Sequence, residues 1–274
     1  MGVIIGILNN KGGVAKTTAT INLGHALANR GKRVLVVDMD NQCNATQKLL
    51  GTEPTETPTI YNVLKSSCSG EDLPDAASCI YATPYDKLFC LPNHKTTAHL
   101  EKNLYDNYPE SMSYMRRFLR EYAHANYDYC LIDTPPNLGI FVLNALLAAD
   151  CAIVPISGGS VDSVHGLKNA MRLINEAKES LGPDESLRFL RILISSADVR
   201  TQTARSVINA VHAGWGPEQS FKTIIPRTTE FEKAEAVGKT IIRFNPAANA
   251  SKGYRALAAE LISIIDGGAY AEES

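Results

Sequence analysis

The sequence predicts an α/β fold in which a doubly wound, mostly parallel twisted sheet carries helices on both faces. Short apolar runs recur along the 274 residues, and most of them are continuous rather than alternating. Continuous apolar runs are typical of strands that a parallel sheet buries on both faces. Several of the segments between these runs have the spacing of amphipathic helices. Strand and helix patterns therefore alternate along the chain, and this alternation favours the fold class.

The predicted strands leave room for connecting helices between them. They cover residues 3–8, 34–37, 88–91, 129–132, 151–156, 190–194 and 223–225. The predicted helices cover residues 17–30, 163–181 and 251–265. We expect the first helix to end before Gly31, because glycine is favoured just beyond a helix C-terminus, and the last to begin with Ser251 as its N-cap.

The connections at 51–87 and 93–111 are rich in polar and turn-forming residues, so we expect surface excursions within one domain. That domain should span residues 1–268 and be followed by a flexible acidic tail at 269–274. No apolar run reaches 18 residues, which excludes a membrane-spanning helix. The six cysteines form no C-x-x-C pair, which argues against a zinc or redox site and for a reducing cytoplasm.

Charge is distributed unevenly along the chain. The net charge is −2, which argues against a general nucleic-acid binder. Residues 188–255, however, hold eleven Lys or Arg and five Asp or Glu, so this segment carries +6 and the remainder carries −8. Such asymmetry can mark a surface that meets a polyanion, and it can equally describe an ordinary solvated face.

A glycine-rich loop follows the first predicted strand, in the stretch NNKGGVAKTT. The usual phosphate-loop pattern is G-x-x-x-x-G-K-[ST], and here the glycines stand instead at Gly12 and Gly13, behind an extra lysine, Lys11. Backbone N–H groups of such a loop can surround an anion, and the N-terminus of the next helix adds partial positive charge. We expect Lys16 to neutralise the β- and γ-phosphates and Thr17 to bind Mg²⁺.

Carboxylates follow two further predicted strands. Asp38 and Asp40 lie in DMDNQCNAT, two residues apart, so one can belong to the metal shell while the other orients an attacking water. Asp133 lies in YCLIDTPPNLG, where an Asp after an apolar strand is expected to bond Mg²⁺ through water. Because ligands of doubly wound folds bind at the carboxyl ends of the strands, the three motifs should meet at one site.

These motifs resemble the ParA/MinD group of ATPases. NKGGVAKTT fits its deviant Walker A pattern x-K-G-G-x-x-K-[ST], and DMDNQCNAT, LIDTPPNLG, TIIPR and YRALAAEL follow in the same order over residues 3–266. The resemblance implies a P-loop ATP hydrolase with ATP and Mg²⁺ as cofactors. It implies a homodimer with ATP between the protomers, in which Lys11 reaches the phosphates of the other subunit, Asp40 positions water, and Thr17, Asp38 and Asp133 serve the metal. The nucleotide contacts would come from Lys11, Gly12, Gly13, Val14, Ala15, Lys16, Thr17, Thr18, Pro226 and Arg227.

The resemblance also implies partners and a cellular role. ParA dimers bind DNA non-specifically, and a ParB-like adaptor stimulates their slow hydrolysis; this cycle positions plasmids, chromosomes or other cargo, which implies a cytoplasmic, nucleoid-associated protein. Arg200 matches a DNA-contacting arginine of the family. Other phosphate contacts could come from the basic segment, through Lys222, Lys233, Lys239, Arg243 and Lys252. The chain departs from the family pattern at Ala15, usually Gly, and at Glu230, often basic.

Three alternatives remain open at this stage. A MinD-like membrane ATPase would need a basic amphipathic C-terminal helix, whereas this chain ends in GGAYAEES. A reductase of the nitrogenase-iron-protein kind would need two cysteines placed to share a cluster, which Cys43 and Cys151 do not match. A regulator that switches a protein partner with nucleotide, without DNA, is supported by the acidic Glu230.

Overall fold

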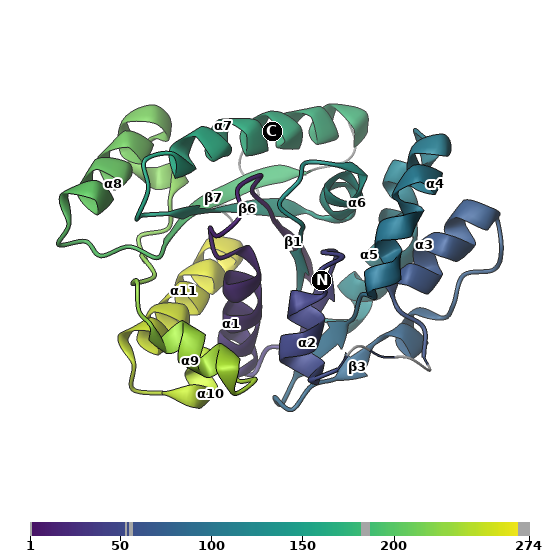
Figure 1. The fold of residues 1–274 in the computed structure, drawn as a ribbon, viewed down its shortest axis with the longest axis horizontal. Coiled ribbons are helices and arrows are strands. Elements are labelled where there is room, and N and C mark those ends of the chain that lie inside the picture. Colours follow the sequence, from purple (N-terminus) through teal and green to yellow (C-terminus); the bar gives the residue numbers. More distant parts are fainter. Residues whose placement is uncertain (1, 53, 55–56, 182–186, 268–274) are drawn as a thin grey trace.

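A twisted sheet forms the centre of the computed structural model (Figure 1). Its strands follow the order β3-β4-β2-β5-β1-β6-β7. The structure describes residues 2–52, 54, 57–181 and 187–267. Every neighbouring pair of strands in this part of the chain is parallel except β3 and β4, which are antiparallel. The strands are β1 (Val3–Ile7), β2 (Val34–Asp38), β3 (Tyr81–Ala82), β4 (Leu88–Leu91), β5 (Tyr129–Asp133), β6 (Cys151–Ser157) and β7 (Arg188–Ser195).

Helices pack on both faces of the sheet (Figure 1). One face carries α1 (Lys16–Ala28), α2 (Asn44–Leu50), α9 (Glu230–Ala236), α10 (Ile241–Phe244) and α11 (Asn249–Asp266). The other carries α3 (Ile60–Ser69), α4 (Glu101–Asp106), α5 (Tyr114–Asn126), α6 (Ile140–Ala148), α7 (Ser163–Leu181) and α8 (Gln202–Trp215). Short 3₁₀ segments are η1 (Ala76–Cys79), η2 (Lys95–Leu100), η3 (Glu110–Ser113) and η4 (Pro217–Gln219).

The sheet lies between two hydrophobic cores, because successive strand residues point to opposite faces. In β1, Ile4 belongs to the core under α5 and α6, while Ile5 and Ile7 belong to the core under α1. In β2, Leu35 and Val37 face the first core, and the intervening valines face the second. All these side chains are at most 1% exposed. Burial on both faces explains why the strands read as continuous apolar runs.

This arrangement confirms the predicted fold class and six of the seven predicted strands. The predicted strand at 223–225 is wrong. Its segment runs along β7, where Ile225 N–H donates to the Ile194 carbonyl at 3.0 Å, but no continuous ladder forms. The N–H groups of Lys222 and Thr223 donate instead to the carboxylate of Glu260 on α11, at 2.7 and 2.9 Å. A side chain of α11 therefore takes the Thr223 N–H, a donor of the predicted strand.

The helix boundaries differ from the prediction in two places. The first helix starts at Lys16 and ends at Ala28, and Gly31 lies just beyond with φ 85°, in the left-handed region that glycine favours. The last helix begins at Asn249, so Ser251 is not its N-cap. The Ser251 hydroxyl is buried and hydrogen-bonds the carbonyls of Ile241 and Asn245. It thus ties the start of α11 to α10.

The expectation of surface excursions at 51–87 and 93–111 also needs correction. These stretches contain α3, β3, η1, η2 and α4, and α3 buries Ile60, Val63 and Leu64 completely in the core beside α5. Helix α3 starts with a capping box, in which Thr59 and Asn62 satisfy each other's backbone donors. The polar composition of these stretches concealed a short amphipathic helix. The predicted tail at 269–274 lies outside the described residues.

Candidate active site

The glycine-rich loop joins β1 to α1 at the edge of the sheet where the parallel strands end. Gly13 has φ 73°, and a Cβ added at Gly12 or Gly13 would meet no atom within 4 Å. Ala15 also lies in the left-handed region, with φ 66°, and is the N-cap residue of α1. Open space over the glycines and a helix N-terminus behind them make a loop that can accept an anion.

The two lysines of the loop contact each other through the backbone. Lys16 is 7% exposed, and its Nζ donates to the carbonyl oxygen of Lys11 at 3.1 Å. Burial lowers the pKa of the Lys16 ammonium, although the negative charges of Asp133 and Asp40 act in the opposite direction. Lys11 itself is half-buried. The ammonium of Lys16 thus lies in a poorly solvated position next to the two carboxylates. Its interactions with charged groups are stronger there than in water.

Two of the predicted metal-site carboxylates lie side by side on adjacent strands. Asp38 ends β2, Asp133 ends β5, and the two are direct Cα partners. Both are fully buried. Burial raises the pKa of each carboxyl group above its ordinary value, and the neighbouring charge raises it further. A divalent cation placed between them would remove this repulsion.

The hydrogen bonds of this pair leave one oxygen without a partner. Asp38 Oδ2 accepts from the N–H and hydroxyl of Thr46, at 2.8 and 2.7 Å. Asp133 Oδ1 accepts from the Thr20 hydroxyl at 3.3 Å, and the hydroxyl of Thr17 lowers the pKa of Asp133. Asp133 Oδ2, however, is buried and has no hydrogen-bond partner among the described residues.

These residues fit Mg²⁺ better than a metal held by protein ligands alone. Within the described ranges no group of three or more His, Cys, Asp or Glu side chains could hold a metal ion. Mg²⁺ usually keeps several waters and binds through one or two carboxylates together with substrate phosphates. The unpartnered oxygen of Asp133 beside a phosphate-type loop matches that pattern.

Asp40 lies two residues after Asp38, just beyond the end of β2, and is 5% exposed. Its Oδ1 accepts the N–H of Gln42 at 3.0 Å, and its own N–H donates to Asp38 Oδ1 at 3.2 Å. These bonds fix the turn after β2, so the Asp40 carboxylate is held close to both Lys16 and Asp133, as their mutual charge effects require. The structure therefore brings together the residues of all three predicted motifs.

Comparison with known proteins places this geometry in a family. A model named AAA_31, described as an AAA domain, matches residues 2–187. The sporulation initiation inhibitor protein Soj of Bacillus subtilis is 34% identical over 262 residues, which cover 95% of this chain and 98% of Soj. The chromosome partitioning protein ParA of Myxococcus xanthus is 35% identical over 262 residues, covering 96% and 88%. The chain belongs to the ParA/MinD family of ATPases. The resemblance found in the sequence motifs is thus confirmed.

Solved structures agree with this assignment. Cobyrinic acid a,c-diamide synthase from Mycobacterium smegmatis, with bound ADP and magnesium, has a TM-score of 0.80 and 28% identity, covering 98% of this chain and 97% of that one. The cell division ATPase MinD of Pyrococcus furiosus has a TM-score of 0.74 at 24% identity, covering 96% and 100%, and shows the shared fold. In the described residues of this ParA/MinD protein, no helix is both long and apolar enough to cross a membrane.

Pro226 and Arg227, the predicted adenine-side residues, lie in the segment beside β7. Arg227 is exposed, and its N–H donates to the Ala197 carbonyl at 3.2 Å. The other side of this segment packs on α11, where a Cβ at Gly253 would lie 3.3 Å from Ile225 and 3.5 Å from Pro226. Ser195 connects the end of β7 to the glycine-rich loop, because its buried hydroxyl lies 3.1 Å from the Val14 carbonyl.

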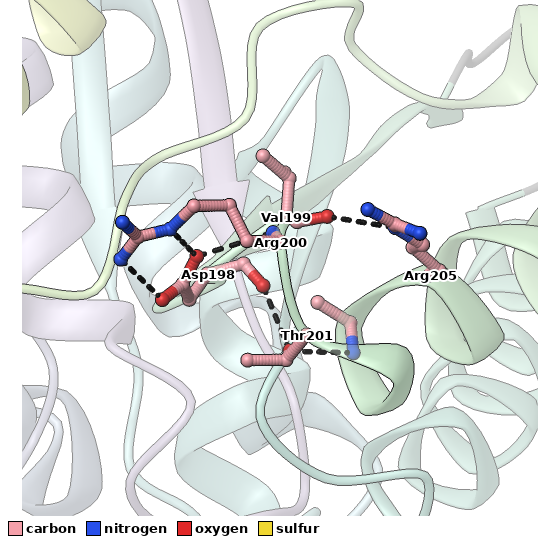
Figure 2. A network of polar contacts seen from close by, with 6 residues as sticks. Asp198, Val199, Arg200, Thr201 and Arg205 are labelled. Atoms are coloured by element: carbon pink, nitrogen blue, oxygen red, sulfur yellow. Dashed lines mark hydrogen bonds and ion pairs between the residues drawn. The ribbon is translucent and has the colours of Figure 1, made fainter.

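The predicted DNA-contacting residues of this ParA/MinD chain are exposed but do not form a single cluster. Lys233, Lys239 and Arg243 lie on α9, on α10 and between them, whereas Arg200 lies in the loop between β7 and α8. Figure 2 shows the Arg200 guanidinium paired with Asp198 through two hydrogen bonds, at 2.9 and 2.8 Å. Lys222 is exposed, next to the backbone contact with Glu260.

The two departures from the family pattern have clear structural settings. Ala15 occupies a backbone conformation that glycine adopts without steric cost. Glu230 is the first residue of α9, and its Oε1 accepts from the side-chain amide of Asn245 at 2.8 Å. An acidic side chain at a helix N-terminus is favourable for the helix, which gives Glu230 a structural role independent of DNA.

Sequence reasoning did not assign several residues that support the site. Thr46 anchors Asp38, Thr20 contacts Asp133, and Ser195 reaches the glycine-rich loop. Thr46 lies within the DMDNQCNAT motif, where its position could have drawn attention. Ser195 lies about 180 residues from its partner along the chain, and no sequence pattern marks that contact.

Proposed function

We propose that this protein is an ATP-dependent, dimerising ParA-type ATPase that binds DNA non-specifically and positions plasmid, chromosome or other cargo. The observation that carries the proposal is the meeting of Lys16 with Asp40 and Asp133, the second of them paired with Asp38, behind a loop that holds a second lysine, Lys11. A lone glycine-rich turn would not require buried carboxylates beside a buried ammonium, because each has a desolvation cost that a bound nucleotide and metal would offset. The proposal treats residues 1–268 as one ATPase domain.

The proposed cofactors are ATP and Mg²⁺. The loop from Lys11 to Thr18 would surround the phosphates with backbone N–H groups, and Pro226 and Arg227 would border the adenine. Thr17, Asp38 and Asp133 would hold the metal, for which the unpartnered Asp133 Oδ2 is the best-placed ligand or water acceptor. Mg²⁺ bound there would neutralise charge on the β- and γ-phosphates.

The proposed chemistry needs only positioning and charge from the chain. The Lys16 ammonium would exchange the Lys11 carbonyl for phosphate oxygens, which are stronger acceptors. The Asp40 carboxylate, held by the Gln42 N–H, would accept a hydrogen bond from the attacking water and orient it. We expect turnover without a partner to be far below the roughly 1–100 s⁻¹ of kinases.

Dimerisation would depend on Lys11. Its ammonium would contact the phosphates bound by the second protomer, much as an arginine finger supplied in trans does. ATP would then join two subunits, and hydrolysis would release them. A ParB-like adaptor would stimulate that step, and binding of the dimer to DNA would place the protein on the nucleoid.

DNA binding would use exposed cations at separate places, Arg200 in the loop between β7 and α8 and others near α9 and α10. Lys222, Lys233, Lys239 and Arg243 are all exposed and free to approach phosphates. A second candidate function, a nucleotide-switched regulator that binds a protein partner without DNA, is favoured by two observations. Glu230 adds a negative charge on α9, the helix that carries Lys233, and Asp198 pairs with Arg200.

One experiment separates the two functions. Binding to a random-sequence duplex is measured with ATP, ADP or no nucleotide over a salt series, for the wild type and for Lys11→Ala and Lys16→Ala. The ParA-type function predicts binding only with ATP, a steep fall in affinity with salt, and loss in both variants. ATP-driven dimerisation without DNA binding at low salt would favour the regulator, and unchanged ATP affinity in Lys16→Ala would contradict the nucleotide site itself.

A further inference from the structure

The backbone N–H and the backbone carbonyl of Lys11 both form hydrogen bonds with side chains. Its N–H donates to the side-chain Oδ1 of Asn9 at 3.0 Å, and its carbonyl accepts from Lys16 Nζ at 3.1 Å. Asn9 is fully buried, and its Nδ2 donates to the carbonyl of Pro155 in β6 at 2.7 Å. The Asn9 amide therefore links strand β6 to the backbone of the lysine.

Helix α7 closes this arrangement from outside. A Cβ added at Gly166 would lie 2.7 Å from Asn9 Oδ1, 2.8 Å from Asn10 Oδ1 and 3.1 Å from Lys11 Cγ. The aliphatic stem of Lys11 thus crosses α7 at the one position without a side chain. Asn9 cannot give way cheaply, because its Oδ1 is the acceptor of the Lys11 N–H and its Nδ2 is bonded to the sheet.

We propose that Asn9 and Gly166 are positioning residues that aim Lys11 at the nucleotide of the second protomer; this inference rests on the cross-dimer role proposed for Lys11. A free lysine side chain has many rotamers and loses their entropy when it binds. A fixed N–H and a stem packed on α7 remove part of that cost beforehand. Neither residue contacts the side chain of Lys16, which bonds the Lys11 carbonyl instead, so the inference assigns Asn9 and Gly166 to the support of Lys11.

The inference predicts that variants of Asn9 and Gly166 weaken dimerisation but leave nucleotide binding by the monomer nearly unchanged. Gly166→Ala would push Asn9 and the Lys11 stem away from α7, and Asn9→Ala would release the Lys11 N–H. We expect the affinity of each monomer for Mg²⁺ with a non-hydrolysable ATP analogue to stay within about threefold of wild type. We expect the dimer dissociation constant in the presence of that analogue to rise about tenfold or more, since a displacement near 1 Å can cost about 100-fold in a positioned site.

The experiment measures both quantities, by titration calorimetry and by sedimentation of the full chain. Gly214→Ala is the matched control, because Gly214 is also helical and a Cβ there would meet nothing within 4 Å. Lys11→Ala is the reference for complete loss. If the two supports act through the same contact, the Asn9→Ala/Gly166→Ala double variant should be no weaker than Asn9→Ala alone.

Each outcome decides a different claim. A weakened dimer with retained nucleotide affinity in the folded variants supports the inference. Wild-type dimerisation in Gly166→Ala or Asn9→Ala, while Lys11→Ala is monomeric, overturns it and leaves the proposed function standing. Parallel loss of nucleotide affinity also overturns it, because the supports would then serve the whole loop. A Lys11→Ala protein that still dimerises refutes the cross-dimer role itself. If Gly166→Ala does not fold, Asn9→Ala decides alone.

Discussion

The carboxylate of Asp198 forms a two-point ion pair with the guanidinium of Arg200, in which Nε and Nη2 lie 2.9 and 2.8 Å from its two oxygens. The backbone N–H of Arg200 donates to the same carboxylate at 3.1 Å. Thr201 caps α8 beside this pair, and Arg205 reaches back to the Val199 carbonyl (Figure 2). The Arg200 side chain is nevertheless 87% exposed. The carboxylate occupies the place that a DNA phosphate would take on the same guanidinium.

We therefore predict that Asp198→Asn strengthens the proposed DNA binding. Asparagine keeps the oxygen that accepts the Arg200 N–H but removes the competing charge. One additional phosphate contact should steepen the slope of log affinity against log salt concentration by about 0.9. Fluorescence anisotropy with a random duplex and ATP measures both effects. Asp72→Asn, at an exposed site after α3, controls for net charge. Equal affinities in the two variants would show that Asp198 does not compete with phosphate.

Ala15→Gly should relieve backbone strain in the glycine-rich loop. The left-handed conformation of Ala15 costs about 1–2 kcal/mol because of its Cβ, and glycine removes this cost. Part of the resulting stabilisation is lost, because glycine has more conformational freedom in the unfolded chain. The expected net change is an increase of about 1 kcal/mol in the free energy of unfolding, with ATP affinity at least as high as in wild type. Denaturant unfolding and calorimetry test this. The control, Ala213→Gly at an exposed helical position, should lose about 1 kcal/mol.

Asp40→Ala and Asp40→Asn should both slow ATP hydrolysis strongly while ATP binding persists. Asparagine preserves the acceptor for the Gln42 N–H and hence the turn, so a loss in both variants would point to the charge rather than to the fold of the turn. Phosphate release under single-turnover conditions measures the hydrolysis step. The ATP-bound dimer should outlast that of the wild type in sedimentation. Wild-type turnover in either variant would rule out a water-orienting role for Asp40.

His25 should make the protein less stable in mild acid. Its Nδ1 lies 2.6 Å from the Thr240 hydroxyl, its ring centroid lies 4.3 Å from that of Tyr85, and it is 6% exposed. Burial, together with the charges of Arg243 and Arg255, lowers the pKa of His25 to about 4. The native state therefore stays unprotonated where the unfolded state, with an ordinary histidine pKa of about 6.5, already binds a proton.

The sign follows from proton uptake: the unfolded state binds more protons between about pH 6.5 and pH 4, so the free energy of unfolding falls as the pH falls through that window. The loss should amount to about 1.4 kcal/mol for each unit of difference between the two pKa values. Urea unfolding of wild type and His25→Gln over this range measures it, and the variant should show the shallower slope. His99→Gln, at an exposed position, should behave as wild type. Identical slopes in wild type and His25→Gln would contradict the prediction.

The strands and the carboxyl-end motifs could be predicted because they are local. Buried parallel strands such as β1 and β5 require continuous apolar runs, and a glycine-rich turn before a helix needs Gly13 at positive φ. The predictions that were wrong concern segments whose structure depends on contacts with residues distant in the sequence. Residues 223–225 have the composition of a strand, but the carboxylate of Glu260 accepts the N–H groups of Thr223 and of the preceding Lys222. Ser251 is a residue type that is common at the N-cap, but its hydroxyl donates to the Ile241 carbonyl in α10.

The sequence by itself determined the fold class, the family and the identity of the residues at the strand ends, since these depend on residue type, spacing and order along one chain. Tertiary structure alone decided how those residues are supported. The pairing of β2 with β5 places Asp38 opposite Asp133, and the packing of α7 places Gly166 against Lys11. Neither contact leaves a local pattern, because each joins residues more than 90 positions apart, and the space that one side chain leaves for another exists only once the chain is folded.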